Sequence, residues 1–93
     1  MIWYDISMAK KSEEFKIRIS NPHEVVWEGT ATALSSENSQ GKFDVLSQHA
    51  NFITIIKEKP ITLHFSDGST KDYKFPRAVI YNRNNQVFVH TQI

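Results

Sequence analysis

The chain has 93 residues, a net charge of +1 from 11 Lys and Arg against 10 Asp and Glu, and no cysteine. A chain of this length fits one domain, which buries only about 60–65% of its unfolded surface and would gain stability from a partner. The balanced charge argues against nucleic acid and anionic membranes as partners, and the lack of cysteine excludes disulfides and thiol chemistry.

The first 14 residues have no clear helical or strand period. We interpret residues 1–14 as an N-terminal arm, either flexible or a short extra element, ahead of a domain over residues 15–93. No apolar run has the roughly 18–20 residues of a transmembrane helix, and no signal peptide is recognised, so we expect a soluble protein. Trp3 and Tyr4 are hard to bury in such an arm. Exposed aromatic side chains mark protein contacts more often than cofactor sites, which makes both residues candidate partner contacts.

From Phe15 onward, apolar and polar residues alternate with a period of two, as in half-buried strands. Strands are expected at residues 15–20 and 25–27, and we expect Trp27 to be largely buried between two sheets. Gly29 permits a bend or bulge before a further strand at residues 30–34. The polar segment that follows, residues 35–40, is interpreted as a loop.

The second half of the chain continues the same pattern. Residues 52–56 form a compact apolar run, read as a well-buried strand. Asp67-Gly68 is the strongest hairpin signal and predicts a type I′ turn, which needs positive φ at both central residues. Further strands are expected around residues 43–45, 61–65, 73–75, 79–81 and 87–91, with a turn at residues 82–85. Short strands at this spacing, without a convincing helix, predict an all-β fold: a single antiparallel β-sandwich or flattened barrel of about 8–10 strands.

No catalytic, cofactor-binding or metal site is predicted. The four histidines, His23, His49, His64 and His90, are scattered without the spacing of metal ligands. Ser47 and His49 share a turn, but the glycine-flanked nucleophile elbow and a third group to orient the histidine are missing. No glycine-rich loop with a lysine could cradle phosphate, so nucleotide binding is not expected.

Residues 41–52, Gly-Lys-Phe-Asp-Val-Leu-Ser-Gln-His-Ala-Asn-Phe, resemble a signature of the rotary ATP synthase epsilon subunit, which is called delta in mitochondria. That signature reads Gly-x-Phe-Gly-Val-Leu-Pro-Gly-His-Ala-Pro-Leu. The matching residues are Gly41, Phe43, Val45, Leu46, His49 and Ala50. The strand pattern agrees from Phe15 to about His90, whereas Asp44, Ser47, Gln48 and Asn51 replace glycines and prolines of the family. Because those residue types define backbone geometry, the replacements concern the loops rather than the sandwich.

The resemblance implies the N-terminal β-sandwich domain of the family, without the C-terminal helical hairpin that usually follows. It implies a non-catalytic central-stalk module that binds the gamma subunit and the c-ring and couples rotation to ATP synthesis and proton translocation. The contact residues it implies are Lys42, Ser47, Gln48 and His49 on the c-ring side and Asn21 on the gamma side. The resemblance places the chain at the soluble face of an energy-coupling membrane, first the bacterial cytoplasmic side and, as the alternative, an organelle matrix or stroma, with membrane contact only through the complex. The alternative is a stand-alone β-sandwich scaffold or ligand-binding module unrelated to the motor.

Overall fold

The computed structural model describes residues 13–48 and 50–92, so expectations for residues 1–12, among them Trp3 and Tyr4, and for His49 lie outside the described residues. The described residues contain nine strands and no helix. The strands are β1 (Phe15–Ser20), β2 (Val25–Ala31), β3 (Ala33–Asn38), β4 (Gly41–Leu46), β5 (Phe52–Ile56), β6 (Pro60–His64), β7 (Thr70–Lys74), β8 (Ala78–Arg83) and β9 (Gln86–Thr91).

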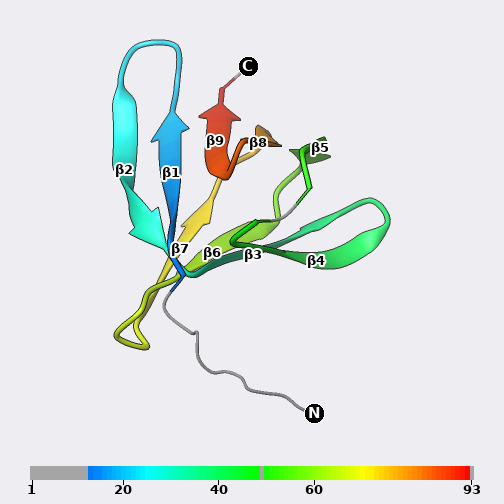
Figure 1. The fold of residues 1–93 in the computed structure, drawn as a ribbon. Coiled ribbons are helices and arrows are strands. Elements are labelled where there is room, and N and C mark those ends of the chain that lie inside the picture. The colour runs from blue at the N-terminus through cyan, green and yellow to red at the C-terminus, as the bar shows by residue number, and fades with distance from the viewer. Residues whose placement is uncertain (1–12, 49, 93) are drawn as a thin grey trace.

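The strands form two sheets, one with the order β2-β1-β9-β8-β5 and one with the order β4-β3-β6-β7. In Figure 1 the two sheets are clearly separate, with β1, β2 and β9 upright and the β3–β4 hairpin extending across below them. The predicted β-sandwich is therefore confirmed. One pair departs from the antiparallel expectation, because β1 and β9 run parallel in the middle of the five-stranded sheet. Strands so far apart in the sequence need no tight turn between them, and the hydrophobic pattern does not encode their relative direction.

The core lies between the sheets and consists mainly of branched aliphatic side chains, together with Phe15, Ala31 and Ala78. Alternate residues of each central strand face inward, as a period of two requires. Ile17, Ile19, Leu34, Ile61, Leu63, Ile80, Val87 and Val89 are all fully buried. Six aromatic side chains pack around this cluster while remaining half-buried: Trp27, Phe43, Phe52, Phe65, Tyr73 and Phe75.

The polar segment that was expected to be a loop is largely strand β3, which pairs with both β4 and β6. Its central Ser36 is buried, and the Ser36 hydroxyl donates a 3.0 Å hydrogen bond to the carbonyl of Pro60. A satisfied hydroxyl can be buried at little cost, so a serine-rich strand survives in the sheet. Tertiary partners outweighed local propensity here.

Gly29 lies inside β2 rather than at a bend. A Cβ atom at this position would lie 2.8 Å from the Cη2 and Cζ2 atoms of Trp27, so the Trp27 ring lies over the glycine. The ring also contacts Phe65, with 5.9 Å between ring centroids. Trp27 lies on the edge strand β2, opposite the buried Ile19, and is partly buried against the core cluster, which agrees with the expected inward orientation. The glycine serves close packing, and the register shift of β2 occurs instead opposite Ile19 and Ser20.

The positive φ values expected at both central residues of the β6–β7 hairpin turn occur in the β8–β9 turn instead. Asp67 and Gly68 do lie in the β6–β7 hairpin, but only Gly68 has positive φ, at 89°. Its N–H donates a 3.0 Å hydrogen bond to the Phe65 carbonyl, as in a three-residue loop with a glycine bulge, so the type I′ prediction is wrong. Positive φ at both central residues occurs at Asn84 and Asn85, with φ of 54° and 63°, between β8 and β9.

The strand β5 is the edge of the five-stranded sheet, and within residues 13–48 and 50–92 β8 is the only strand that pairs with it. Ile56 is buried, but Ile53 and Ile55 are 68% and 46% exposed. The expectation of a well-buried strand is therefore wrong. An apolar run of five residues indicates a strand but does not say whether the second side of that strand is covered.

Candidate partner-binding surfaces

The loop between β4 and β5, residues 47–51, is attached to the β8–β9 hairpin by hydrogen bonds from asparagines. The Gln48 N–H donates to Asn85 Oδ1 at 2.7 Å, and the Asn84 N–H donates to Asn51 Oδ1 at 3.0 Å. The buried Asn82 donates from Nδ2 to the Ala50 carbonyl at 3.0 Å. Since two separate chain segments hold each other in this way, the loop is a defined surface at one end of the sandwich.

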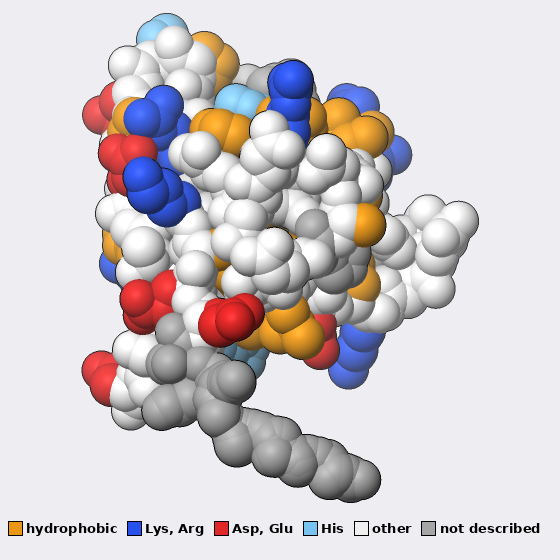
Figure 2. Space-filling model, viewed as in Figure 1, with side chains coloured by type: hydrophobic (Ala, Val, Ile, Leu, Met, Phe, Trp, Pro, Cys, Tyr) orange, Lys and Arg blue, Asp and Glu red, His pale blue; other side chains and the backbone are white. Residues whose placement is uncertain are grey.

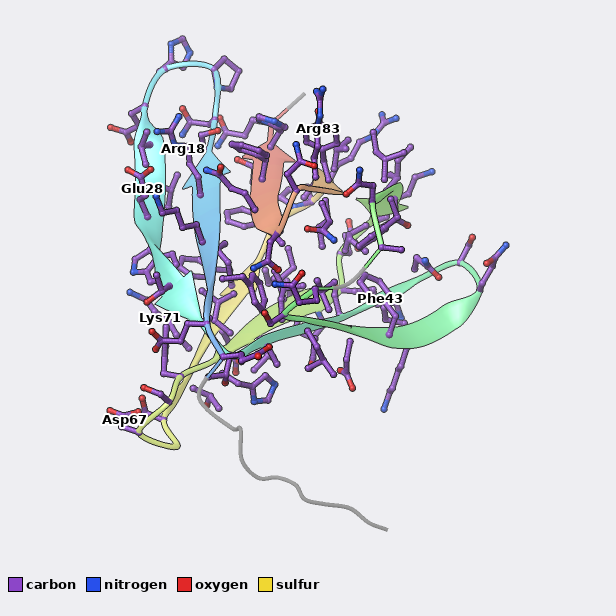
Figure 3. The ribbon with its side chains drawn as sticks, in the orientation of Figure 1. Arg18, Glu28, Phe43, Asp67, Lys71 and Arg83 are labelled. Atoms are coloured by element: carbon purple, nitrogen blue, oxygen red, sulfur yellow. The ribbon has the colours of Figure 1, made fainter. Side chains whose placement is uncertain are left out.

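Two aromatic side chains flank the same loop. Phe43 precedes it on β4 and Phe52 follows it on β5, and their rings meet edge to face with centroids 6.2 Å apart. Figure 3 shows Phe43 pointing from β4 toward the space between the sheets. This contact supports the loop from below, while Gln48 is exposed and Ser47 is half-buried.

Lys42 does not lie near this loop. It is the second residue of β4 and faces Glu37 across the β3–β4 hairpin, whereas Ser47 follows the other end of the strand. Four residues of β4 lie between the two, and five steps of 3.3 Å each place them about 16 Å apart. The structure therefore brings Ser47 and Gln48 together and places Lys42 apart from them. Lys42 and Ser47 are close in sequence but far apart in space, because the strand between them is extended.

Asn21 has a structural role in the turn between β1 and β2. Its Oδ1 accepts hydrogen bonds from the N–H groups of His23 and Glu24 at 2.8 and 2.9 Å, and its own N–H donates to the Glu24 carbonyl at 3.0 Å. Asparagine favours such turns because its side chain replaces a backbone partner. This turn lies beside His90, near the C-terminal end of β9. Gln48 lies beside the β8–β9 hairpin, at the opposite end of the same strand.

Asn21 also borders a groove of about 640 Å³ on the outer face of the five-stranded sheet. Tyr81 and Phe88 line its floor with ring centroids 5.6 Å apart, and His90 stacks on Phe88 at 6.2 Å. Arg18 and Arg83 contribute the positive charge of this groove. The sequence did not single out these residues, although each alternates with a buried neighbour on its strand, which is the signal that would have identified this outward face.

The charges of this face are balanced rather than uniform. Arg18 Nη2 forms an ion pair of 3.0 Å with Glu28 Oε2, and Figure 3 shows the two side chains facing each other from β1 and β2. Figure 2 shows acidic and basic side chains interleaved on the same side of the molecule. Tyr81 accepts a 3.3 Å hydrogen bond from Arg83 Nη1, which raises the pKa of Arg83. The groove therefore combines an aromatic floor with a mixed-charge rim, as protein contacts do.

One cluster contains the residue types of a catalytic triad without its arrangement. The Ser35 hydroxyl donates to Asp44 Oδ1 at 2.6 Å and lies 3.0 Å from Nε2 of His64. Serine thus bridges the two other residues, whereas a triad needs histidine between serine and carboxylate so that it can remove the serine proton. The contact joins three neighbouring strands on the outer face of the smaller sheet.

Neither a metal centre nor a membrane span can be assigned from the described part of the chain. Residues 13–48 and 50–92 contain no group of three or more His, Asp or Glu side chains that could hold a metal ion. The same residues contain no helix long and apolar enough to cross a membrane.

Comparison with known proteins gives a consistent family. The chain is 23% identical over 78 residues to the ATP synthase epsilon chain of Clostridium novyi (strain NT), covering 84% of this chain and 60% of that protein. It is 22% identical over 85 residues to the ATP synthase epsilon chain of Chlorobium limicola, covering 91% and 97%. The chain spans about three-fifths of the length of the Clostridium relative and of a similar epsilon chain from Sulfurimonas denitrificans.

Two solved structures share the fold. One belongs to the mitochondrial ATP synthase of Euglena gracilis, described as OSCP/F1/c-ring in rotational state 1, with a TM-score of 0.77, 13% identity, and coverage of 97% of this chain and 56% of that chain. The other belongs to the central stalk and c-ring of the Tetrahymena thermophila mitochondrial enzyme, with a TM-score of 0.71, 6% identity, and coverage of 84% and 63%. Residues 14–92 match the family described as "ATP synthase, Delta/Epsilon chain, beta-sandwich domain", and the chain therefore belongs to this family.

Proposed function

We propose that the chain is a non-catalytic central-stalk module of a rotary ATP synthase, which binds the gamma subunit and the c-ring and so couples rotation to ATP synthesis and proton translocation. Family membership over residues 14–92 supports the assignment to the stalk. The observation that supports the two-partner model is that the chain presents two different candidate surfaces, the hydrogen-bonded loop at residues 47–51 and the aromatic groove bordered by Asn21, which adjoin at Asn84 of the β8–β9 hairpin.

The groove is the proposed gamma surface. Aromatic side chains supply large contact area with little conformational entropy to lose, and the rim of Arg18, Arg83 and Glu24 can orient a partner by charge. Asn21 shapes the turn that closes one end of the groove, so we assign it a positioning role rather than a direct contact.

The loop at residues 47–51 is the proposed c-ring surface. Its described residues Gln48, Ala50 and Asn51 are exposed and suit the polar loops of a membrane ring, and their hydrogen bonds with asparagines of β8 and the β8–β9 turn order them before binding. Lys42 would reach the ring only if the contact extended along β4 toward the β3–β4 hairpin. Attachment by this loop would place the chain at the soluble face of the membrane, touching the bilayer through the complex alone.

The test compares two variants in binding to purified cognate gamma subunit and to c-ring in lipid vesicles. The loop variant Ser47→Ala/Gln48→Ala/His49→Ala is expected to weaken c-ring binding by roughly 5- to 150-fold and to leave gamma binding within about twofold. The groove variant Tyr81→Ala/Phe88→Ala should do the reverse. Lys71→Ala, on an edge of the other sheet, serves as the matched control and should change neither.

Lys42→Glu is measured separately, because Lys42 lies apart from the loop. A loss of ring binding in this variant would extend the ring surface along β4. Normal binding of both partners by the loop and groove variants, with the fold intact in a thermal melt, would contradict the proposed function.

A further inference from the structure

The open edge of β5 is unlike the other strand edges of this molecule. Its sequence, Phe-Ile-Thr-Ile-Ile, contains no charge, proline or glycine, and among the described residues β8 is the one strand beside it. The outward-facing Ile53 and Ile55 are exposed. Proteins normally protect such edges, because unpaired N–H and C=O groups beside apolar side chains attract further strands.

The other three edges carry protective features. The strand β7 bears Lys71, Asp72 and Lys74, and β4 bears Lys42 and Asp44. The strand β2 is interrupted by a register shift and carries Glu28. Since these devices are present at three edges and missing at β5, the unprotected edge is a feature of the β5 sequence and not of the whole fold.

Two hollows lie along β5, next to the tip of the β3–β4 hairpin. One, of about 570 Å³, is lined by Phe52, Ile53, Thr54, Ile55, Val79 and residues 38–40. The other, of about 350 Å³, contains Ile55 together with Lys57 and Lys59. Asn38 Nδ2 donates a 3.0 Å hydrogen bond to Thr54 Oγ1 and so fixes the hairpin beside the strand. Hollows beside an open edge can receive the side chains of an added strand, whose backbone pairs with the edge.

The charges at the end of β5 favour one orientation of an added strand. Lys57 and Lys59 follow the strand and line the smaller hollow with a single acid, Glu37. The Glu58 N–H between them donates to the Phe75 carbonyl at 3.2 Å, which fixes this turn against the β7–β8 connection. A strand that runs antiparallel to β5 would bring its N-terminal residues to these lysines, so acidic residues there would be favoured.

We propose that the β5 edge is a strand-addition site for an extended segment of a partner protein, with alternating apolar residues and one or two carboxylates at its N-terminal end. The segment pairs antiparallel with β5, its apolar side chains contact Ile53 and Ile55, and its carboxylates lie near Lys57 and Lys59. This site goes beyond the proposed stalk function and does not depend on it, because it uses a sheet edge outside both candidate surfaces.

The probe is a synthetic peptide, acetyl-Asp-Glu-Ile-Thr-Ile-Thr-Val-amide, titrated into the full chain by calorimetry and by amide hydrogen exchange. We expect a Kd below about 1 mM, slower exchange in β5, and weaker binding as salt is raised. A lysine-tipped peptide and one with proline in place of the central threonine should each bind at least about tenfold more weakly, because the first reverses the charge and the second removes a backbone donor.

Protein variants locate the site. Ile53→Lys/Ile55→Lys should reduce peptide binding at least about tenfold, while Leu46→Lys, whose side chain is 54% exposed on the β4 edge, should not change it. Lys57→Glu/Lys59→Glu should make the lysine-tipped peptide the better ligand. Equal binding by the isoleucine variant, or no binding at 1 mM peptide, would overturn the proposal. Dimerisation of the wild-type chain through β5 without peptide binding would also overturn it, in favour of a second copy as occupant.

Discussion

The strands β1 and β5 both carry a phenylalanine followed by isoleucines, but they occupy different positions in the same sheet and differ in the residues between the isoleucines. In β1, Phe15, Ile17 and Ile19 are buried and their neighbours are polar. In β5 the buried residue is Ile56, while the outward positions are also isoleucines, at 53 and 55. The strand β1 has β2 and β9 beside it and presents polar side chains on its outer face. A strand whose outer face is apolar and whose edge is open still has surface to bury, which indicates a partner.

The largest effect is expected from Ile17→Ala. Ile17 is fully buried in β1, so its truncation removes transfer free energy and leaves a cavity, and should lower the free energy of unfolding by about 2–5 kcal/mol. Urea unfolding followed by circular dichroism measures this change. A loss below about 1 kcal/mol would mean that the core between the sheets relaxes around the cavity, and that β1 is not the better-packed strand.

A smaller loss is expected from Gly29→Ala at the other edge of the sheet. The new methyl group would lie 2.8 Å from the Trp27 ring, which Phe65 holds from one side, so overpacking should cost about 1–3 kcal/mol. Thermal melts of the single variants and of Gly29→Ala/Trp27→Phe form a double-mutant cycle. The smaller phenyl ring should recover much of the loss, whereas additive effects would show that the ring can move away freely.

Ile55→Thr should change the free energy of unfolding by no more than about 0.5 kcal/mol, because the side chain is exposed and threonine suits a strand. The same urea unfolding measurement as for Ile17→Ala gives a direct contrast between the two isoleucines. A loss comparable to that of Ile17→Ala would show that Ile55 is covered in the isolated chain, and would remove the basis for a partner at β5.

The smallest effect is a pH dependence at the β6–β7 turn. The Ser69 hydroxyl donates to Asp67 Oδ1 at 2.6 Å and the Ser69 N–H donates at 2.9 Å, and these bonds lower the pKa of Asp67 below its ordinary value of 3.8. Its contribution to stability is therefore present above pH 3.8 and is lost as the pH falls through the folded-state pKa.

Ser69→Ala removes the hydroxyl that is the first cause of this shift, and should flatten the acid side of the stability profile slightly. Urea midpoints measured between pH 5 and pH 2 check this expectation. A profile identical to that of the wild type would mean that the Ser69 hydroxyl does not stabilise the ionised form of Asp67 in the folded state.

The sequence by itself determined most strands, the sandwich class and the family, because a period of two and a spaced motif are local patterns. Strand Phe15–Ser20 and the hairpin at Asp67 and Gly68 illustrate this. The sequence also placed Ser47 and Gln48 in one loop, because these two residues are adjacent in the chain. The sequence did not predict that the Trp27 ring packs over Gly29 or that Ser36 lies in a strand. It also did not predict that Lys42 is separated from that loop.

Only the tertiary structure decided which strands are edges, that β1 and β9 run parallel, and which asparagines hold the loop. Asn82, Asn84 and Asn85 act on residues more than 30 positions away, so no local pattern marks them. Likewise, Phe-Ile-Thr-Ile-Ile has the same composition whether one or two strands flank it. The side of a strand that remains unpaired depends on sheet order, which is a property of the assembled fold.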